Sequence, residues 1–112
     1  MRLKFAIASF FFLWTLSSYA SDWQQLASFG AEGRHRGTAI SIGTRGYMGL
    51  GHYNGTGNNF IKADWWEYDP ATNAWTQKSD HPTGNYGVIS FSVGSVGYVG
   101  SGQISSNIYK YD

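Results

Sequence analysis

One stretch of this chain occurs twice, and that repetition constrains its fold more than any other feature. Residues 33–51 return as residues 84–102, at an offset of 51 residues. Equivalent positions share a tyrosine and several glycines, which in the first copy are Gly33, Gly43, Gly46, Tyr47, Gly49 and Gly51. A self-match of this period is typical of repeat proteins, in which each unit buries its apolar face against the next one. The sequence therefore predicts two copies of one structural unit.

Short runs in both copies alternate between apolar and small residues. Ala39–Ile42 and Ser90–Val93 each place two apolar side chains on one face of an extended strand. Glycines separate these runs from the next ones, at points where a tight hairpin turn requires a positive φ. From residue 21 onward, no segment shows apolar residues that recur with a sustained helical period. We therefore predict an all-β fold.

The order of the runs predicts four strands in the first unit and three in the second. The first unit has strands at Thr38–Ile42, Gly46–Gly51, Asp64–Asp69 and Ala74–Lys78. The second unit has strands at Val88–Val93, Val96–Gly102 and Asn107–Asp112. The predicted loop at His52–Ala63 is eight residues longer than its counterpart Gln103–Ser106. Because surface loops absorb insertions more readily than paired strands do, this difference supports a structural repeat.

The motifs of both units resemble kelch repeats. The first unit contains a Gly-Tyr strand that ends in glycine at Gly46–Gly51, then Trp66–Pro70, then Trp75. The second unit contains Gly97–Gly102 and Tyr109–Asp112. The resemblance covers residues 21–112. It implies kelch-type β-propeller blades, each a four-stranded antiparallel sheet, with tyrosine and tryptophan packed between the blades.

Propellers typically have four to eight blades, so about two blades give an incomplete ring. We assign residues 21–30 to the fourth strand of a preceding or closing blade, because Trp23 stands where Trp75 stands in Ala74–Lys78. Residues 33–78 are assigned to one blade and residues 84–112 to an incomplete blade. Three explanations stay open: an N-terminal fragment of a longer propeller, a chain that closes a ring with other chains, or a truncated product without independent function.

The first twenty residues have the features of a secretory signal peptide. Met1–Lys4 gives a positive start, Phe5–Leu16 is an apolar run, and Ser18–Ala20 places small residues at a cleavage site. The apolar run is short for a membrane span, and no second run of that length follows. We therefore expect an exported protein, periplasmic, cell-surface or extracellular, with no transmembrane segment in the mature chain.

Composition limits the partners of the mature chain. Removal of residues 1–20 leaves six basic residues against seven acidic ones, since Arg2 and Lys4 are lost. No basic patch remains, which argues against a nucleic-acid partner. The chain has no cysteine, so no disulfide can stabilise it. Packing between units, or between chains, must supply the stability of so small a domain.

The strand order places the long loops of both units at one face, which we predict to be the interaction surface. Polar and aromatic loop residues there form our candidate ligand-binding set, which comprises Arg34, His35, Arg36, His52, Tyr53, Asn54, Asn58, Asn59, Asn85 and Tyr86. Arginines of this kind either clamp an anionic group or pair with an acidic residue of a neighbouring blade. The kelch resemblance favours a protein or glycan partner at this face.

No catalytic constellation stands out in the sequence. His35, His52 and His81 match no short metal-binding spacing, and we predict neither a metal nor a cofactor. Galactose oxidase-like propellers need copper and a cysteine crosslinked to tyrosine, which this chain lacks. Sialic-acid mutarotase-like proteins are exported kelch propellers and stay an alternative, as part of a carbohydrate-active enzyme. The sequence favours a binding scaffold over an enzyme.

Overall fold

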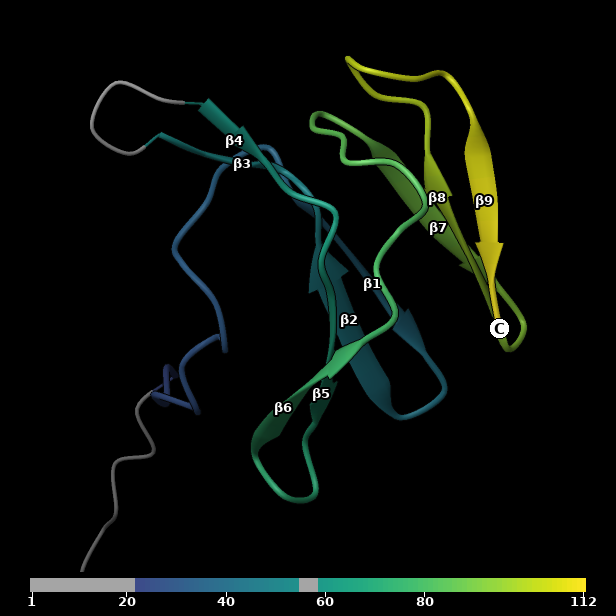
Figure 1. Ribbon diagram of the computed structural model, residues 1–112. Coiled ribbons are helices and arrows are strands. Elements are labelled where there is room, and N and C mark those ends of the chain that lie inside the picture. The colour runs from purple at the N-terminus through teal and green to yellow at the C-terminus, as the bar shows by residue number, and fades with distance from the viewer. Residues whose placement is uncertain (1–21, 55–58) are drawn as a thin grey trace, which may run out of the picture.

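The computed structural model describes residues 22–54 and 59–112. These residues form antiparallel strands and contain no helix (Figure 1), which confirms the predicted all-β fold. It follows that no helix within these two ranges is long and apolar enough to cross a membrane. The predicted signal peptide, residues 1–20, lies outside the described residues.

The first sheet has four antiparallel strands in the order β1-β2-β5-β6. Their bounds are Thr38–Ile42 for β1, Arg45–Gly49 for β2, Trp65–Asp69 for β5 and Ala74–Lys78 for β6. Gly43 turns the chain between β1 and β2 with a φ of 57°. Asn73, with a φ of 51°, ends the predicted turn between β5 and β6. The four predicted strands of the first unit are therefore confirmed, with bounds that shift by up to two residues.

The second sheet repeats this arrangement with three strands in the order β7-β8-β9. Strand β7 spans Ile89–Val93, β8 spans Val96–Gly100 and β9 spans Ile108–Tyr111. The pairing Ser92↔Gly97 in this sheet corresponds to Ser41↔Gly46 in the first sheet. Equivalent residues thus take equivalent places in the two sheets, and the sequence repeat is a structural repeat.

The predicted loop at His52–Ala63 contains a hairpin that the sequence analysis missed. Strands β3 (His52–Asn54) and β4 (Asn59–Ile61) form a separate two-stranded sheet. The rings of Tyr53 and Phe60 face each other across it, with centroids 6.4 Å apart. Stacking between opposite aromatic residues stabilises such a ribbon and explains why this segment is not an irregular loop.

Residues 22–29 form no strand in the structure, although we assigned 21–30 to the fourth strand of another blade. Instead the backbone of Ala27 bonds to side chains of the first sheet, accepting from Trp75 Nε1 at 3.1 Å and donating to Asn73 Oδ1 at 2.9 Å. Phe29 then packs edge-on against Trp66 and Trp75. Whether this segment closes a ring stays a prediction.

The core lies between the two sheets, where β1 packs beside β7 and β8 (Figure 1). Its buried members are Leu50, Trp65 and Val99. A Cβ placed on Gly97 would lie 2.5 Å from Ile40 Cδ1, so the absent side chain of Gly97 makes the room that Ile40 fills. Thr38 Oγ1 and Ser90 Oγ, 2.5 Å apart, add a polar contact between the sheets. The first sheet thus offers an apolar face that the second sheet covers.

Candidate functional site

The long connections gather at one end of the two sheets, which we call the loop end and define as residues 33–37, the β3–β4 hairpin, and residues 84–87 and 101–107 (Figure 1). Main-chain hydrogen bonds hold these segments together. His35 and His52 exchange a pair of backbone bonds of 3.1 and 3.0 Å, and Gly51 N donates to Asn85 O at 2.8 Å. Gly87 N donates to Arg36 O at 2.8 Å. These main-chain bonds therefore fix the positions of the Cα atoms that bear the candidate side chains.

Five of the predicted site residues meet at the loop end. The rings of His35 and His52 lie 3.8 Å apart at their centroids, and Tyr86 lies 4.6 Å from His52. His52 Nδ1 is 3.2 Å from Asn54 Oδ1. The guanidinium of Arg36 lies 5.8 Å from the centre of the Tyr86 ring. His35, Arg36 and Asn54 are exposed, so the cluster presents imidazole, amide and guanidinium groups to solvent.

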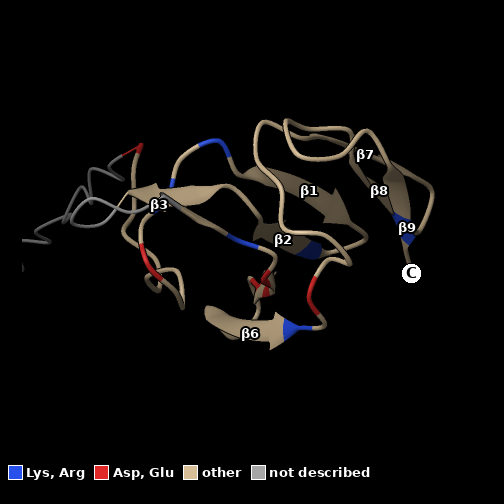
Figure 2. Ribbon diagram, turned by 45° about the horizontal axis from the view of Figure 1, so that its top comes forward, with Lys and Arg blue, Asp and Glu red and all other residues tan. Residues whose placement is uncertain are grey.

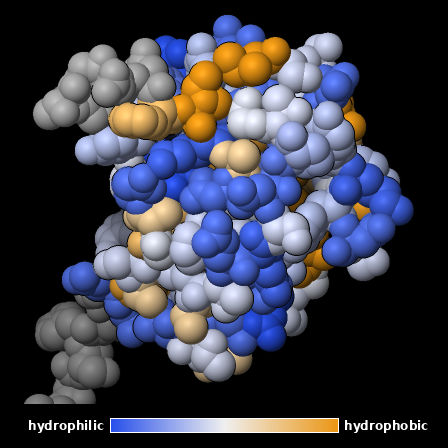
Figure 3. All heavy atoms as spheres, viewed as in Figure 1, coloured by the Kyte–Doolittle hydropathy of each residue, from blue (hydrophilic) through white to orange (hydrophobic). Residues whose placement is uncertain are grey.

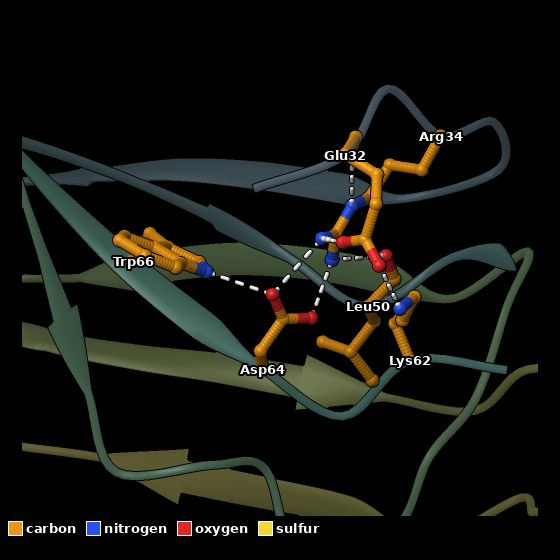
Figure 4. Close-up of polar contacts among 6 residues, drawn as sticks. All are labelled: Glu32, Arg34, Leu50, Lys62, Asp64 and Trp66. Atoms are coloured by element: carbon orange, nitrogen blue, oxygen red, sulfur yellow. Dashed lines mark hydrogen bonds and ion pairs between the residues drawn. The ribbon is translucent and has the colours of Figure 1, made fainter. Parts of the chain in front are cut away.

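Arg34 is a predicted site residue whose side chain is engaged inside the protein (Figure 4). Its guanidinium makes a fork of two hydrogen bonds to Asp64, of 2.5 and 2.9 Å, and donates to Leu50 O at 3.3 Å. Only 3% of this side chain is exposed. Arg34 therefore pairs with an acidic residue and does not face a ligand, but its partner Asp64 belongs to the same unit and not, as we predicted for such a pair, to a neighbouring blade.

The carboxylate of Asp64 is held in its ionised form by this network. Burial raises the pKa of Asp64, but hydrogen bonds from Arg34 and Trp66 outweigh that effect and keep the pKa below its ordinary value. Trp66 Nε1 donates to Asp64 Oδ2 at 2.7 Å. Lys62 and Glu32, 2.5 Å apart, extend the network toward solvent, and the hydrogen bond from Lys62 lowers the pKa of Glu32. This network holds the segment before β1 against the segment before β5.

Asn85 is also a structural residue, and it is completely buried. Its Oδ1 accepts hydrogen bonds from the backbone of Tyr86 and Ile104, at 2.9 and 3.0 Å. Its Nδ2 donates to Ser105 O at 3.0 Å. Asn85 therefore ties residues 101–107 to the segment before β7, and it presents no polar atom to a ligand.

The remaining predicted site residues belong to the β3–β4 hairpin. Tyr53 is 37% exposed, and Asn59 pairs with Asn54 through the register of the hairpin. Asn58 lies outside the described residues. Figure 3 shows apolar residues gathered over this end of the molecule, and the exposed side chains Phe60, Ile61 and Ile104 belong to its segments. The hairpin thus adds an apolar surface beside the polar cluster.

His81, the third histidine, is engaged away from this cluster. Its Nδ1 lies between the backbone N and O of Thr83, and its Nε2 is 3.3 Å from Val99 O. It borders a cavity of about 210 Å³ between the two sheets, which Trp65, Tyr109 and Tyr111 also line. The kelch resemblance implied that tyrosine and tryptophan pack between the blades, and no pattern in the sequence indicated a cavity beside them.

Charges are spread over the described part of the molecule. Figure 2 shows acidic and basic segments interspersed, and neither sign covers a continuous face. Across residues 22–54 and 59–112, no group of three or more His, Cys, Asp or Glu residues is placed to hold a metal ion. The loop end presents the ring and amide groups of His35 and Asn54 and the guanidinium of Arg36 to solvent.

Comparisons with known proteins found a distant likeness among solved structures. No family model matches the chain, and no curated protein matches it. The solved structure of YjhT resembles it with 27% sequence identity and a TM-score of 0.59 over 69% of this chain. The chain spans 23% of the length of that protein. About two thirds of this chain therefore resembles part of a larger known structure.

Proposed function

We propose that this chain is a segment of an exported, kelch-type β-propeller that serves as a binding scaffold for a protein or glycan partner. The main support for a propeller is a difference in burial between equivalent faces of the two sheets. In the first sheet, Ile40 and Ile42 lie against Gly97 of the second sheet. Their equivalents in the second sheet, Phe91 and Val93, are 46% and 62% exposed.

A third sheet of the same repeat fits the exposed face of the second sheet. Ile108, which takes the place of the buried Trp65, is 47% exposed there, so the open face continues across the sheet. Apolar sheet faces are stable when another layer covers them. Repetition of the existing packing, with a glycine in the role of Gly97, would cover Phe91 and Val93 and generate successive blades. The match to less than a quarter of the length of YjhT supports a fragment of such a longer protein, which we place at the N-terminus because of the predicted signal peptide.

The binding role rests on the loop end. Exposed His35, Arg36 and Asn54 lie beside the apolar hairpin, on a framework that main-chain bonds and Asn85 hold in place. Binding residues commonly lie on loops that a rigid scaffold positions. A mixed surface of this kind suits a partner that brings both polar and apolar groups.

The absence of cysteine from the sequence allows a direct test of the propeller. Single cysteines would be introduced as Phe91→Cys on the open face and as Ser95→Cys in the turn between β7 and β8, in the complete product of the gene with any cysteine outside residues 1–112 replaced by serine. A thiol reagent should label Ser95→Cys rapidly and Phe91→Cys many-fold more slowly, because further blades cover the face. Equal labelling rates in the folded protein would contradict the proposed packing.

The scaffold role has its own test. The β3–β4 hairpin, residues 52–61, would be shortened to the length of the 103–106 connection in the complete protein. We expect the shortened protein to keep its fold, by circular dichroism, and to lose a partner that the unaltered protein retains. Retention of the same partner at unchanged affinity would place the binding surface elsewhere.

A further inference from the structure

His52 has one ring nitrogen whose hydrogen-bonding capacity is unused. Its Nδ1 faces Asn54 Oδ1, and since an amide oxygen can only accept, Nδ1 carries the proton. Its Nε2 therefore carries a lone pair, and this buried atom has no hydrogen-bond partner among residues 22–54 and 59–112. His52 as a whole is 8% exposed. Buried polar atoms are nearly always paired, so an unpaired acceptor indicates a group that the protein alone does not supply.

His35 lies directly opposite His52 across a pair of antiparallel backbone bonds. Opposite residues on such a pair project to the same side, with Cβ atoms about 4.5–5.5 Å apart. The two imidazole rings consequently adjoin, with centroids 3.8 Å apart and planes inclined by 53°. His35 is exposed, whereas His52 is held between His35 and Tyr86. One ring is thus fixed and the other can move.

We propose that His35 and His52 form a two-imidazole site for a divalent transition-metal ion. A metal-binding histidine usually donates its second ring N–H to a carbonyl or carboxylate, which fixes the tautomer, and Asn54 supplies this contact to His52. Imidazole nitrogen suits Cu²⁺, Ni²⁺ and Zn²⁺, whereas Mg²⁺ and Ca²⁺ require oxygen ligands. With two protein ligands, water completes the coordination of the ion.

The distance between the rings sets the movement that binding requires. Metal–nitrogen bonds of about 2.0–2.1 Å place two imidazoles of one ion roughly 5 Å apart at their centres. His35 must therefore swing outward by about 1 Å from its present contact with His52, and its exposure permits that movement. The backbone bonds between the two residues need not change. This site is independent of the proposed propeller, because both histidines belong to segments around the first sheet.

Copper, nickel and zinc ions alone are the probes, added to the untagged full chain. Titration calorimetry should show one ion bound per chain, most tightly for Cu²⁺, as the general order of metal affinities predicts, and no binding of Mg²⁺. His35→Gln and His52→Gln should each weaken Cu²⁺ binding at least tenfold. His81→Gln removes a histidine outside the pair and should leave the affinity within twofold.

A second measurement does not depend on the folding of any variant. In the unaltered protein, substoichiometric Cu²⁺ should broaden the imidazole NMR signals of His35 and His52 and leave those of His81 sharp. Equal broadening of all three histidines, or Cu²⁺ affinity that survives in the double variant His35→Gln/His52→Gln, would overturn the site. Absence of any binding would overturn it as well.

Discussion

Arg34 and Asp64 face each other through two nearly parallel hydrogen bonds, one from each terminal nitrogen of the guanidinium. The two residues lie 30 positions apart, one before β1 and the other before β5. Their side chains are 3% and 18% exposed, so the pair is largely withdrawn from water. A forked, partly buried pair of this kind joins two segments in one geometry.

Loss of the Arg34 guanidinium should destabilise the fold strongly. Arg34→Met leaves the partly buried Asp64 carboxylate without its main partner. Breaking a fully buried pair costs about 3–5 kcal/mol, so we expect a loss near or below the lower end of that range. Arg36→Met is the matched control, because the side chain of Arg36 is exposed and, within the described residues, contacts the ring of Tyr86. We expect the control to cost less than about 1 kcal/mol. Urea unfolding of both variants measures the difference, and equal losses would refute the structural role of Arg34.

Asn85→Ala should loosen the connection between β8 and β9. The substitution leaves the backbone N–H groups of Tyr86 and Ile104 without their acceptor. A buried group that loses its partner costs about 1–3 kcal/mol, so a total near the upper value is expected. Asn107→Ala, at an exposed position in the same connection, is the control. Hydrogen exchange at Ile104 should accelerate in Asn85→Ala alone; unchanged protection there would contradict this role.

Gly49→Ala should be far more harmful than Gly33→Ala. A Cβ on Gly49 would lie 3.0 Å from the Cα of Trp65 and closer still to the carbonyl oxygen of Asp64, and neither backbone atom can move aside. A Cβ on Gly33 would meet nothing within 4 Å. Overpacking of this kind costs about 1–3 kcal/mol. Thermal unfolding should show a clear decrease in Tm for the first variant and almost none for the second.

Tyr47 should make the fold sensitive to alkaline pH. Burial and the hydrogen bond to Glu67 raise the pKa of Tyr47 to about 12, from an ordinary value of 10.0. A pKa that is higher in the folded state means that the contribution to stability is complete below pH 10 and is lost as the pH rises toward 12.

Tyr47→Phe removes this titration. The free energy of unfolding of the variant should therefore decline less between pH 10 and 12 than that of the unaltered protein, in urea titrations at each pH. The same pair compared at pH 7 gives the baseline cost of losing the hydrogen bond to Glu67 Oε2. Parallel declines above pH 10 would show that Tyr47 does not cause the alkaline loss.

The strands could be predicted from the sequence because each depends on a local pattern. Alternation in Thr38–Ile42 and glycines at the turns are sufficient to place β1 and its partner, and the repeat transfers the result to β7 and β8. The β3–β4 hairpin was missed because its strands are three residues long and carry little alternation. Its strands are stabilised by a cross-strand contact between Tyr53 and Phe60, which a short run of letters does not reveal.

The sequence predicted where the candidate residues lie, but only partly which of their side chains face solvent and which face the interior. Loop order is sufficient to bring His35, His52 and Tyr86 to one end of the sheets. The inward roles of Arg34 and Asn85 depend on partners far away in the sequence, Asp64 and Ile104. A list of polar loop residues carries no information on which of them find such partners.

The junction at the loop end is made largely from main-chain groups, as in the bonds between His35 and His52 and between Gly51 and Asn85. Main-chain bonds are available to almost any residue, so side chains at positions 35, 36 and 52 can be exchanged while the junction persists. Related chains could therefore acquire new ligands through a few substitutions, without rebuilding the sheets. Such a division between a main-chain frame and replaceable side chains also makes this end of the molecule a practical starting point for engineering new binding specificities.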